Sequence, residues 1–280
     1  MKKLLALLLL PLSTGAMAAF ADWTVDQKPF KLYGNSYYVG SKGLSAVLIT
    51  SPAGHILIDG TVRENAPMIA RHVRQLGFKM EDIKLILNSH SHSDHAGGIA
   101  ELQRMSGAQV LGGAAGLSTL VEGKAQSDDP QFGSLSDFPA NPGARGVKDG
   151  EVVSLGALAI TAHATPGHTA GGTSWTWQAC EGKRCMQMVY IDSLTAVSAD
   201  GYKFSEHPEI VASLRSSIAS VAALPCDIPV TAHPDFIDLL DKLKQQKRKG
   251  TLAFVDRGGC RELAAGATEW LDKRLASEKK

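Results

Sequence analysis

The first clear hydrophobic pattern in the chain consists of two short runs of aliphatic and β-branched residues. Residues 45–51 and 55–60 form these runs, and a Pro-Ala-Gly segment separates them. Such a segment is typical of a tight turn, so the pattern predicts a β-hairpin. Apolar residues then recur at helical spacing over 66–76 and stop at Gly77, which predicts an amphipathic helix with a glycine cap. Its predicted polar face contains Arg71, His72 and Arg74.

Strands and helices alternate along part of the remaining chain. Residues 83–87 predict a short buried strand, and a second helix is expected to begin near Gly97. Further strands are expected at 109–112, 158–163, 173–177, 188–191 and 228–231. Two apolar stripes predict helices that face a core. The first stripe contains Ile210, Val211, Leu214, Ile218, Val221 and Leu224, and the second contains Leu263, Ala267, Trp270, Leu271 and Leu275.

The domain organisation expected from this pattern is a single domain over residues 19–280. No linker rich in proline or serine divides this part of the chain. The longest irregular stretch is 123–150, which is rich in Asp, Ser, Pro and Gly. A loop of that length in a compact domain is usually functional or mobile.

The amino-terminal segment has the features of a secretory signal peptide over residues 1–18. Lys2 and Lys3 precede an apolar run, and small residues surround an expected cleavage after Ala18, although Ala21 also fits. The apolar run is too short for a stable transmembrane helix, and no later segment approaches twenty apolar residues. We therefore expect a protein exported to the periplasm, without a membrane anchor, that works as a monomer.

Charge and cysteine content narrow the possible partners and the compartment. Without Lys2 and Lys3 the formal net charge changes from +1 to −1, so nucleic acid is not an expected partner. The basic run at 242–249 is read as the solvated end of a helix. Four cysteines in an exported chain favour disulfides, with three pairings open. Proximity favours Cys180 with Cys185, which leaves Cys226 with Cys260.

The candidate chemistry lies in the segment HSHSDHAGG at 90–98, directly after a predicted strand. His90, His92, Asp94 and His95 bring four potential metal ligands within six positions. Histidine is the commonest transition-metal ligand, and alternating side chains of an extended turn can serve two adjacent ions. The competing interpretation is a polar surface loop without a metal.

Two further histidines end predicted strands in a turn context, namely His168 and His233. His90, His92 and His168 would form a site with three imidazoles, and Asp94, His95 and His233 would form a second site. Two zinc ions so placed could share a hydroxide and support hydrolysis near neutral pH. The remaining histidines are assigned structural positions, with one as a candidate to orient a ligand. They are His55, His72, His207 and, as that candidate, His163.

Three segments of the chain resemble the metallo-β-lactamase superfamily: HSHSDHAGG, ATPGHTAGG at 164–172, and AHP at 232–234. Within it, the chain is similar nearly end to end to the third subclass of class B β-lactamases. The segments at 129–134, 162–168 and 192–196 carry this closer resemblance. The resemblance implies an α/β fold, the four-layer αβ/βα sandwich, with the site at one edge of two central sheets. It also implies two Zn²⁺ ions per chain and the Cys226–Cys260 disulfide, with Cys180–Cys185 as an additional pair.

The resemblance further implies a β-lactam substrate, such as a penicillin, cephalosporin or carbapenem, attacked by a zinc-bound hydroxide. Asp94 would hold the second zinc and help to orient the hydroxide. Ser193 and Thr195 match the positions that bind the substrate carboxylate. Three further positions match less closely: Gln131, Ser127 and Tyr202.

Asp192 leaves an alternative function open. It falls where thioester and lactone hydrolases of the same superfamily, such as glyoxalase-II-like proteins, carry an aspartate that bridges the two metals. The β-lactamase interpretation instead turns Asp192 away and lets Ser193 face the site. A third hypothesis is a zinc-binding protein without turnover. The metal is itself an inference, because iron or manganese also suits mixed histidine and carboxylate ligands.

Overall fold

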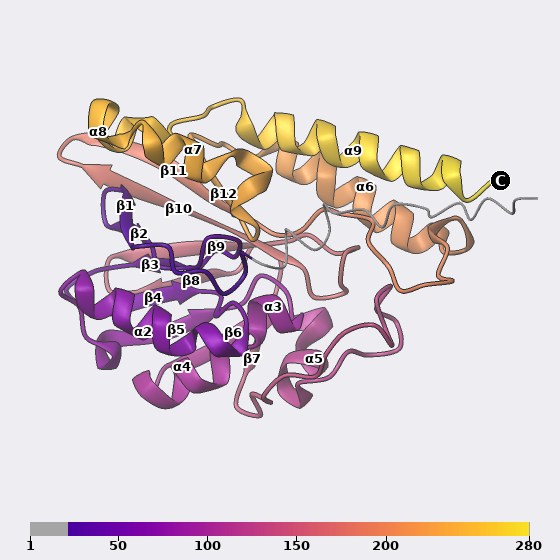
Figure 1. The fold of residues 1–280 in the computed structure, drawn as a ribbon, viewed down its shortest axis with the longest axis horizontal. Coiled ribbons are helices and arrows are strands. Elements are labelled where there is room, and N and C mark those ends of the chain that lie inside the picture. The colour runs from indigo at the N-terminus through magenta and orange to yellow at the C-terminus, as the bar shows by residue number, and fades with distance from the viewer. Residues whose placement is uncertain (1–21, 280) are drawn as a thin grey trace, which may run out of the picture.

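The computed structural model describes residues 22–279 of the chain, so the expected signal peptide lies outside the described residues. Two β-sheets are stacked on each other, and helices cover the outer face of each (Figure 1). Within residues 22–279, no helix has the length and apolar character needed to cross a bilayer. The arrangement confirms the expected four-layer αβ/βα sandwich.

The first sheet contains seven strands in chain order, β1 to β7. Neighbours pair antiparallel from β1 to β4 and parallel from β4 to β7. The strands are β1 (Phe30–Tyr33), β2 (Ser36–Tyr38), β3 (Val47–Ile49), β4 (His55–Ile58), β5 (Ile83–Leu87), β6 (Gln109–Gly113) and β7 (Arg145–Val147).

The second sheet contains five strands in the order β12-β11-β10-β9-β8. All neighbours are antiparallel except β11 and β12, which are parallel. The strands are β8 (Val152–Leu155), β9 (Leu158–Ala164), β10 (Thr173–Glu181), β11 (Arg184–Ile191) and β12 (Ile228–Thr231).

The helices divide between the two sheets (Figure 1). Beside the first sheet lie α2 (Ala66–Gln75), α3 (Ser93–Ala96), α4 (Ile99–Ser106) and α5 (Leu117–Glu122). The long helices α6 (Pro208–Ala223) and α9 (Gly259–Ser277) cover the second sheet, and α7 (Leu239–Lys244) and α8 (Gln246–Lys249) connect β12 to α9.

Three apolar cores hold these layers together. Strand β4 illustrates how one strand contributes side chains to two of them. Ile56 and Ile58 belong to the core between the sheets, whereas Leu57 belongs to the core under α2 and α4. Alternate side chains of a strand point to opposite faces, so a strand covered on both faces is apolar throughout. A third core lies between the second sheet and helices α6 and α9.

Most of the predicted elements are confirmed, and the exceptions are short. The predicted strands at 83–87 and 228–231 match β5 and β12 in both bounds. Strands β1, β2, β7 and β8 were not predicted, and β7 lies inside the stretch expected to be irregular. Strands of three or four residues are too short to establish a periodic pattern.

Two expectations about burial were wrong. His72, expected on a polar helix face, is buried, with Nδ1 2.9 Å from the Val39 carbonyl and Nε2 2.8 Å from Asp26 Oδ1. Trp270, expected in a core stripe, is 43% exposed. Periodicity finds the face of a helix, but the extent of that face covered by neighbours depends on tertiary packing.

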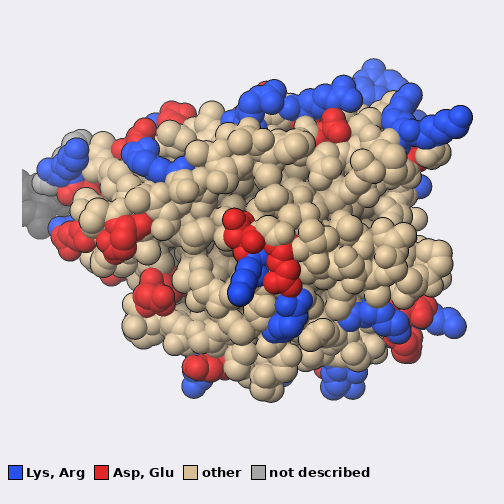
Figure 2. Space-filling view, turned by 180° about the vertical axis from the view of Figure 1, so that it is seen from behind, with Lys and Arg blue, Asp and Glu red and all other residues tan. Residues whose placement is uncertain are grey.

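Both expected disulfides are present. Cys180–Cys185 joins the two strands of the β10–β11 hairpin, and Cys226–Cys260 joins the segment before β12 to α9. The basic run at 242–249 falls on α7 and α8, where Lys247, Arg248 and Lys249 are exposed. Figure 2 shows the molecule from behind the view of Figure 1. Basic side chains gather at the upper right of this rear face, and charges of both signs lie elsewhere on it. This agrees with a solvated helix end.

Candidate metal centre

The histidine-rich loop follows β5, and hydrogen bonds to a buried aspartate fix its first residues. Asp59 accepts hydrogen bonds from Ser89 N at 2.7 Å, Ser89 Oγ at 2.6 Å and the Tyr190 hydroxyl at 2.8 Å. The indole N–H of Trp175, on β10, donates to the Asn88 carbonyl at 3.3 Å. These buried bonds tie the loop to both sheets, so its side chains start from a rigid base. Asp59 has a positive φ of 61° and was not identified from the sequence.

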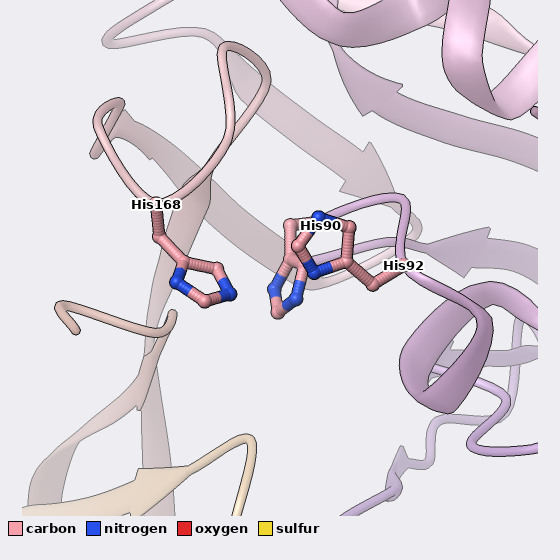
Figure 3. A group of neighbouring side chains, drawn as sticks. All are labelled: His90, His92 and His168. Carbon is pink, nitrogen blue, oxygen red and sulfur yellow. The ribbon is translucent and has the colours of Figure 1, made fainter. Parts of the chain in front are cut away.

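Three imidazoles converge at the end of this loop. His90 and His92 come from the loop after β5, and His168 comes from the turn between β9 and β10 (Figure 3). One nitrogen of each ring lies within 4.8 Å of the others, and all three residues are buried. The structure therefore brings together the first predicted ligand group.

The second nitrogen of each of these rings is hydrogen-bonded to an oxygen atom. His90 Nδ1 is 2.7 Å from Asp192 Oδ1, and His92 Nε2 is 2.8 Å from Asp129 Oδ2. His168 Nδ1 is 3.0 Å from the Thr195 carbonyl. Metal-bound histidines commonly donate their other N–H to such acceptors, which sets the tautomer and the ring orientation. The nitrogens left for a metal are His90 Nε2, His92 Nδ1 and His168 Nε2.

A second group of potential ligands adjoins the first. His90, Asp94 and His95 also offer ligand atoms within 4.8 Å of one another. Asp94 Oδ2 lies 3.1 Å from His95 Nε2 and 3.4 Å from His233 Nε2. The carboxylate thus stands between the two imidazoles of the second predicted site, and all six predicted ligands lie in one cluster.

The protonation states of His90, His168 and Asp94 suit a metal, whereas the carboxylates of Asp94 and Asp59 raise the pKa of His95 despite its burial. Burial and the neighbouring His95 lower the pKa of His90 well below its usual value. Burial, with His92 close by, lowers the pKa of His168 to about 3. Burial alone would raise the pKa of Asp94, but the charges and hydrogen bonds of His95 and His233 hold it well below its usual range. Neutral imidazoles and an ionised carboxylate are the forms that bind metals.

An unpaired polar atom also fits a metal. His90 Nε2, the nitrogen opposite the one that contacts Asp192, is buried without a hydrogen-bond partner. Unsatisfied buried polar groups are costly and need an explanation, and a bound cation supplies one. Nitrogen donors with one carboxylate match the preference of zinc.

Asp192 lies on the outer side of His90. Its Oδ1 contacts His90 Nδ1, the nitrogen that does not face the other imidazoles, and it belongs to neither of the ligand groups found within residues 22–279. Burial raises the pKa of Asp192 well above its usual value. In this position its Oδ1 contacts the nitrogen of His90 that points away from the other imidazoles.

The other predicted site residues lie in different surroundings. The Gln131 amide nitrogen is 3.5 Å from His92 Nδ1 and 3.4 Å from His168 Nε2, beside the first ligand group. Ser193 and Thr195 line a cavity of about 410 Å³. Ser127 lines a smaller cavity of about 240 Å³. The Tyr202 ring stacks on His207 with a centroid distance of 4.4 Å.

His163 does not orient a ligand. Its Nε2 lies 2.8 Å from Thr176 Oγ1, on the neighbouring strand β10. Asp192, Asp129 and Thr195 instead contact the ligand rings, and sequence reasoning assigned this role to none of them. Only Asp129 carried a usable signal, as an acidic residue in the long loop.

Comparison with known proteins agrees with this geometry. A sequence model of the metallo-beta-lactamase superfamily matches residues 40–180. The solved structure of the metallo-beta-lactamase SMB-1 bound to 2-mercaptoethanesulfonate is 54% identical, covers 92% of this chain and 99% of that chain, and has a TM-score of 0.91. MEM-A1, a subclass B3 metallo-beta-lactamase from a soil metagenome library, is 53% identical with the same coverages and a TM-score of 0.90.

More distant similarity links the chain to hydroxyacylglutathione hydrolases. The protein of Anaeromyxobacter dehalogenans (strain 2CP-C) is 33% identical over 93 residues, which cover 33% of this chain and 28% of the relative. The chain spans less than two thirds of the length of the curated relatives it matches. The family match over residues 40–180 and the 54% identity along 99% of a solved relative establish the family. This chain belongs to the metallo-beta-lactamase superfamily.

Proposed function

We propose that the protein is a dizinc β-lactamase that hydrolyses the amide bond of β-lactam antibiotics and so gives resistance to them. The observation that carries the proposal is the assembly of all six predicted ligands in one cluster. The similarity to metallo-beta-lactamases over nearly the whole chain supports the substrate class. The position of Asp192 favours a β-lactamase over a thioester or lactone hydrolase, because the hydrolase hypothesis requires Asp192 to lie between the two metals.

Each group would hold one ion. His90, His92 and His168 would bind the first zinc, and Asp94, His95 and His233 the second, since the Asp94 carboxylate lies close to both of these imidazoles. Bound zinc lowers the pKa of water to around 7 and so supplies a nucleophile at neutral pH. The Asp94 carboxylate, ionised and close to His95 and His233, would help to hold the second ion and would orient the nucleophile by accepting a hydrogen bond from it.

The substrate is held by neutral hydrogen-bond donors. Ser193 and Thr195 provide hydroxyl groups, which bind the carboxylate carried by bicyclic β-lactams. The Gln131 amide, within 3.5 Å of two ligand nitrogens, closes the open side of the first group and can donate to a bound substrate. No protein side chain is needed as a covalent nucleophile.

We also infer that the protein works in the periplasm, as a monomer. Both cysteine pairs are bonded, which suits an oxidising compartment. Residues 1–18 would be removed as a signal peptide, and 19–280 would form one catalytic domain. Sequencing the amino terminus of periplasmic protein and measuring its mass in solution test these inferences.

The function is tested by assaying purified, zinc-loaded protein against a chromogenic cephalosporin and a carbapenem, with elemental analysis of the same sample. We expect hydrolysis of both compounds, two zinc ions per chain, and loss of activity after treatment with a chelator. Thioesters and acyl lactones are assayed in parallel. Turnover of these compounds alone would favour the alternative hydrolase, and no turnover of any compound would favour a non-catalytic zinc protein.

Ser193→Ala tests the carboxylate anchor. Removing one hydroxyl should weaken substrate binding, so we expect KM to rise about tenfold while kcat changes little. The matched control is Ser154→Ala, because Ser154 is exposed on β8 and does not line the cavity. An equal loss of kcat and kcat/KM would contradict the anchoring role.

A further inference from the structure

The cavity of about 410 Å³ that Ser193 and Thr195 line lies beside the candidate metal centre. It lies between α9, the 3-10 helix Pro234–Ile237 and the segments that follow β11 and β12. Thr231 and Ala232, which directly precede the ligand His233, also line it. The cavity is therefore continuous with the proposed carboxylate-binding position.

Apolar side chains form the outer wall of this cavity. Phe236 is 44% exposed and Trp270 43% exposed, and both line it together with Leu263 and Ala267. The rings of Phe236 and Trp270 are 6.5 Å apart, and Phe236 is 5.8 Å from the ring of His233. An aromatic edge thus leads outward from a metal ligand. Large exposed apolar groups around a concave site are typical of ligand binding.

The charged residues of the same cavity have an acidic excess. Apart from Asp192, which is buried against His90, the lining contains the carboxylates of Asp238, Asp256 and Glu262 and the ammonium of Lys242. Lys242 Nζ pairs with Asp256 Oδ2 at 2.6 Å. Within the described part of the chain, Asp238 and Glu262 have no ion pair, so two negative charges remain. A cationic group would complement them.

We propose that this cavity binds the substituent next to the carboxylate-bearing carbon of the β-lactam, and that it prefers an apolar substituent ending in a cation. The assignment rests on the proposed function. In cephalosporins and carbapenems the ring carbon that carries this substituent neighbours the carbon that carries the carboxylate. A carboxylate held by Ser193 and Thr195 therefore directs the substituent into the cavity lined by the same two residues. Trp270 and Phe236 then cover its apolar part.

Gly266 offers a direct way to obstruct the cavity. It lies on α9 and lines the cavity, and a Cβ built there meets no atom within 4 Å. Gly266→Leu therefore adds a bulky side chain at the cavity wall, starting from a Cβ that has open space, and leucine is a better helix former than glycine. Trp270→Ala removes the apolar wall, and Glu262→Gln removes one charge. Val152→Ala, at an exposed position of β8 outside the cavity, is the control.

The experiment measures kcat/KM for three cephalosporins that share one acyl side chain. Their second substituent is a methyl group, a neutral arylthiomethyl group or a pyridiniummethyl group. For Gly266→Leu and Trp270→Ala we expect about a tenfold fall with both large substituents, since a ring-sized apolar area is no longer buried. The methyl compound should change by less than about twofold. Glu262→Gln should impair only the pyridinium compound, and the control should impair none.

Equal effects on all three compounds, or no effect on any, would overturn the cavity assignment while leaving the proposed function intact. If zinc-loaded wild-type protein failed to hydrolyse even the methyl compound, the proposed function itself would be wrong, and the assignment with it. The melting temperature of Gly266→Leu is measured as well. A value at or above that of the wild type would establish that a selective fall in kcat/KM does not come from unfolding.

Discussion

At the scale of single residues, the orientation of the candidate ligand imidazoles depends on oxygen atoms that contact the outer nitrogen of each ring. Asp192, Asp129 and Thr195 each place an oxygen within about 3 Å of one ring nitrogen, so the opposite nitrogen points to the common centre. The acceptors come from distant parts of the chain. Ligand geometry is thus set by contacts across the fold as much as by the ligand loop.

Asp192→Asn tests this role of an orienting carboxylate. The substitution keeps the shape and an acceptor oxygen, but the side chain can no longer take a negative charge beside a metal-bound His90, so we expect zinc affinity to fall about 10- to 100-fold. Competition with a chromophoric chelator measures the affinity. Asp272→Asn, at an exposed position on α9, is the control. Unchanged affinity would contradict the orienting role, and complete loss of one zinc ion would indicate that Asp192 is itself a ligand.

At the scale of secondary-structure elements, helix α9 is anchored beyond its last turn by Glu278. The carboxylate accepts hydrogen bonds from Phe204 N at 3.1 Å, Ser205 N at 2.7 Å and Arg274 Nε at 2.6 Å. Burial would raise the pKa of Glu278, but Arg274 and the donors of Ser205 and Phe204 lower it to about 2. These bonds fasten the end of the helix to the segment that precedes α6.

Glu278→Gln should lower stability in a pH-dependent way. The folded-state pKa of about 2 lies below the ordinary value of 4.5, so the ionised group stabilises the fold above pH 4.5. That contribution is lost as the pH falls from 4.5 towards 2. We expect a cost of about 1 to 3 kcal/mol at pH 7, typical of charged hydrogen bonds, and convergence with wild type in acid.

Thermal melting across this pH range measures the difference. Glu269→Gln is the control on the same helix. Glu269 forms an exposed ion pair with Lys273, so losing its charge should change the free energy of unfolding very little. If the stability difference between Glu278→Gln and the wild type stayed constant down to pH 2, the assigned charge effect would be contradicted.

At the scale of the whole molecule, the metal centre lies where the two sheets meet at one edge. His90, His92, Asp94 and His95 come from the half that contains the first sheet, whereas His168 and His233 follow strands of the second sheet. Neither half holds a complete ligand set. The core between the sheets must therefore pack correctly before His168 and His233 can lie beside the residues of the ligand loop.

The two disulfides should contribute unequally to the stability of this assembly. Cys226–Cys260 spans 34 positions and Cys180–Cys185 spans 5. Constraint of the unfolded chain then contributes roughly 3 to 4 kcal/mol for the longer loop and roughly 2 kcal/mol for the shorter one. Urea unfolding of the two double Cys→Ala variants at saturating zinc measures these values. A larger loss from the hairpin disulfide would contradict the expectation.

Local pattern was sufficient for much of this protein. The ligand loop, the bounds of β5 and β12, the helices α2 and α6, and both disulfide pairs follow from the sequence. Hydrophobic periodicity and the clustering of ligand-type residues depend only on neighbours along the chain, so they can be read without the fold. The short strands β1, β2, β7 and β8 carry too few residues for such a pattern.

Only the tertiary structure decided which way the key side chains face. It turned Asp192 towards His90, buried His72, exposed Trp270 and placed Asp94 between His95 and His233. It also created the cavity beside Ser193. These outcomes depend on contacts between segments far apart in the chain, where a one-residue change in register reverses the direction of a side chain. Sequence determined the candidate metal ligands of this protein, and packing between the two sheets determined how their side chains are oriented.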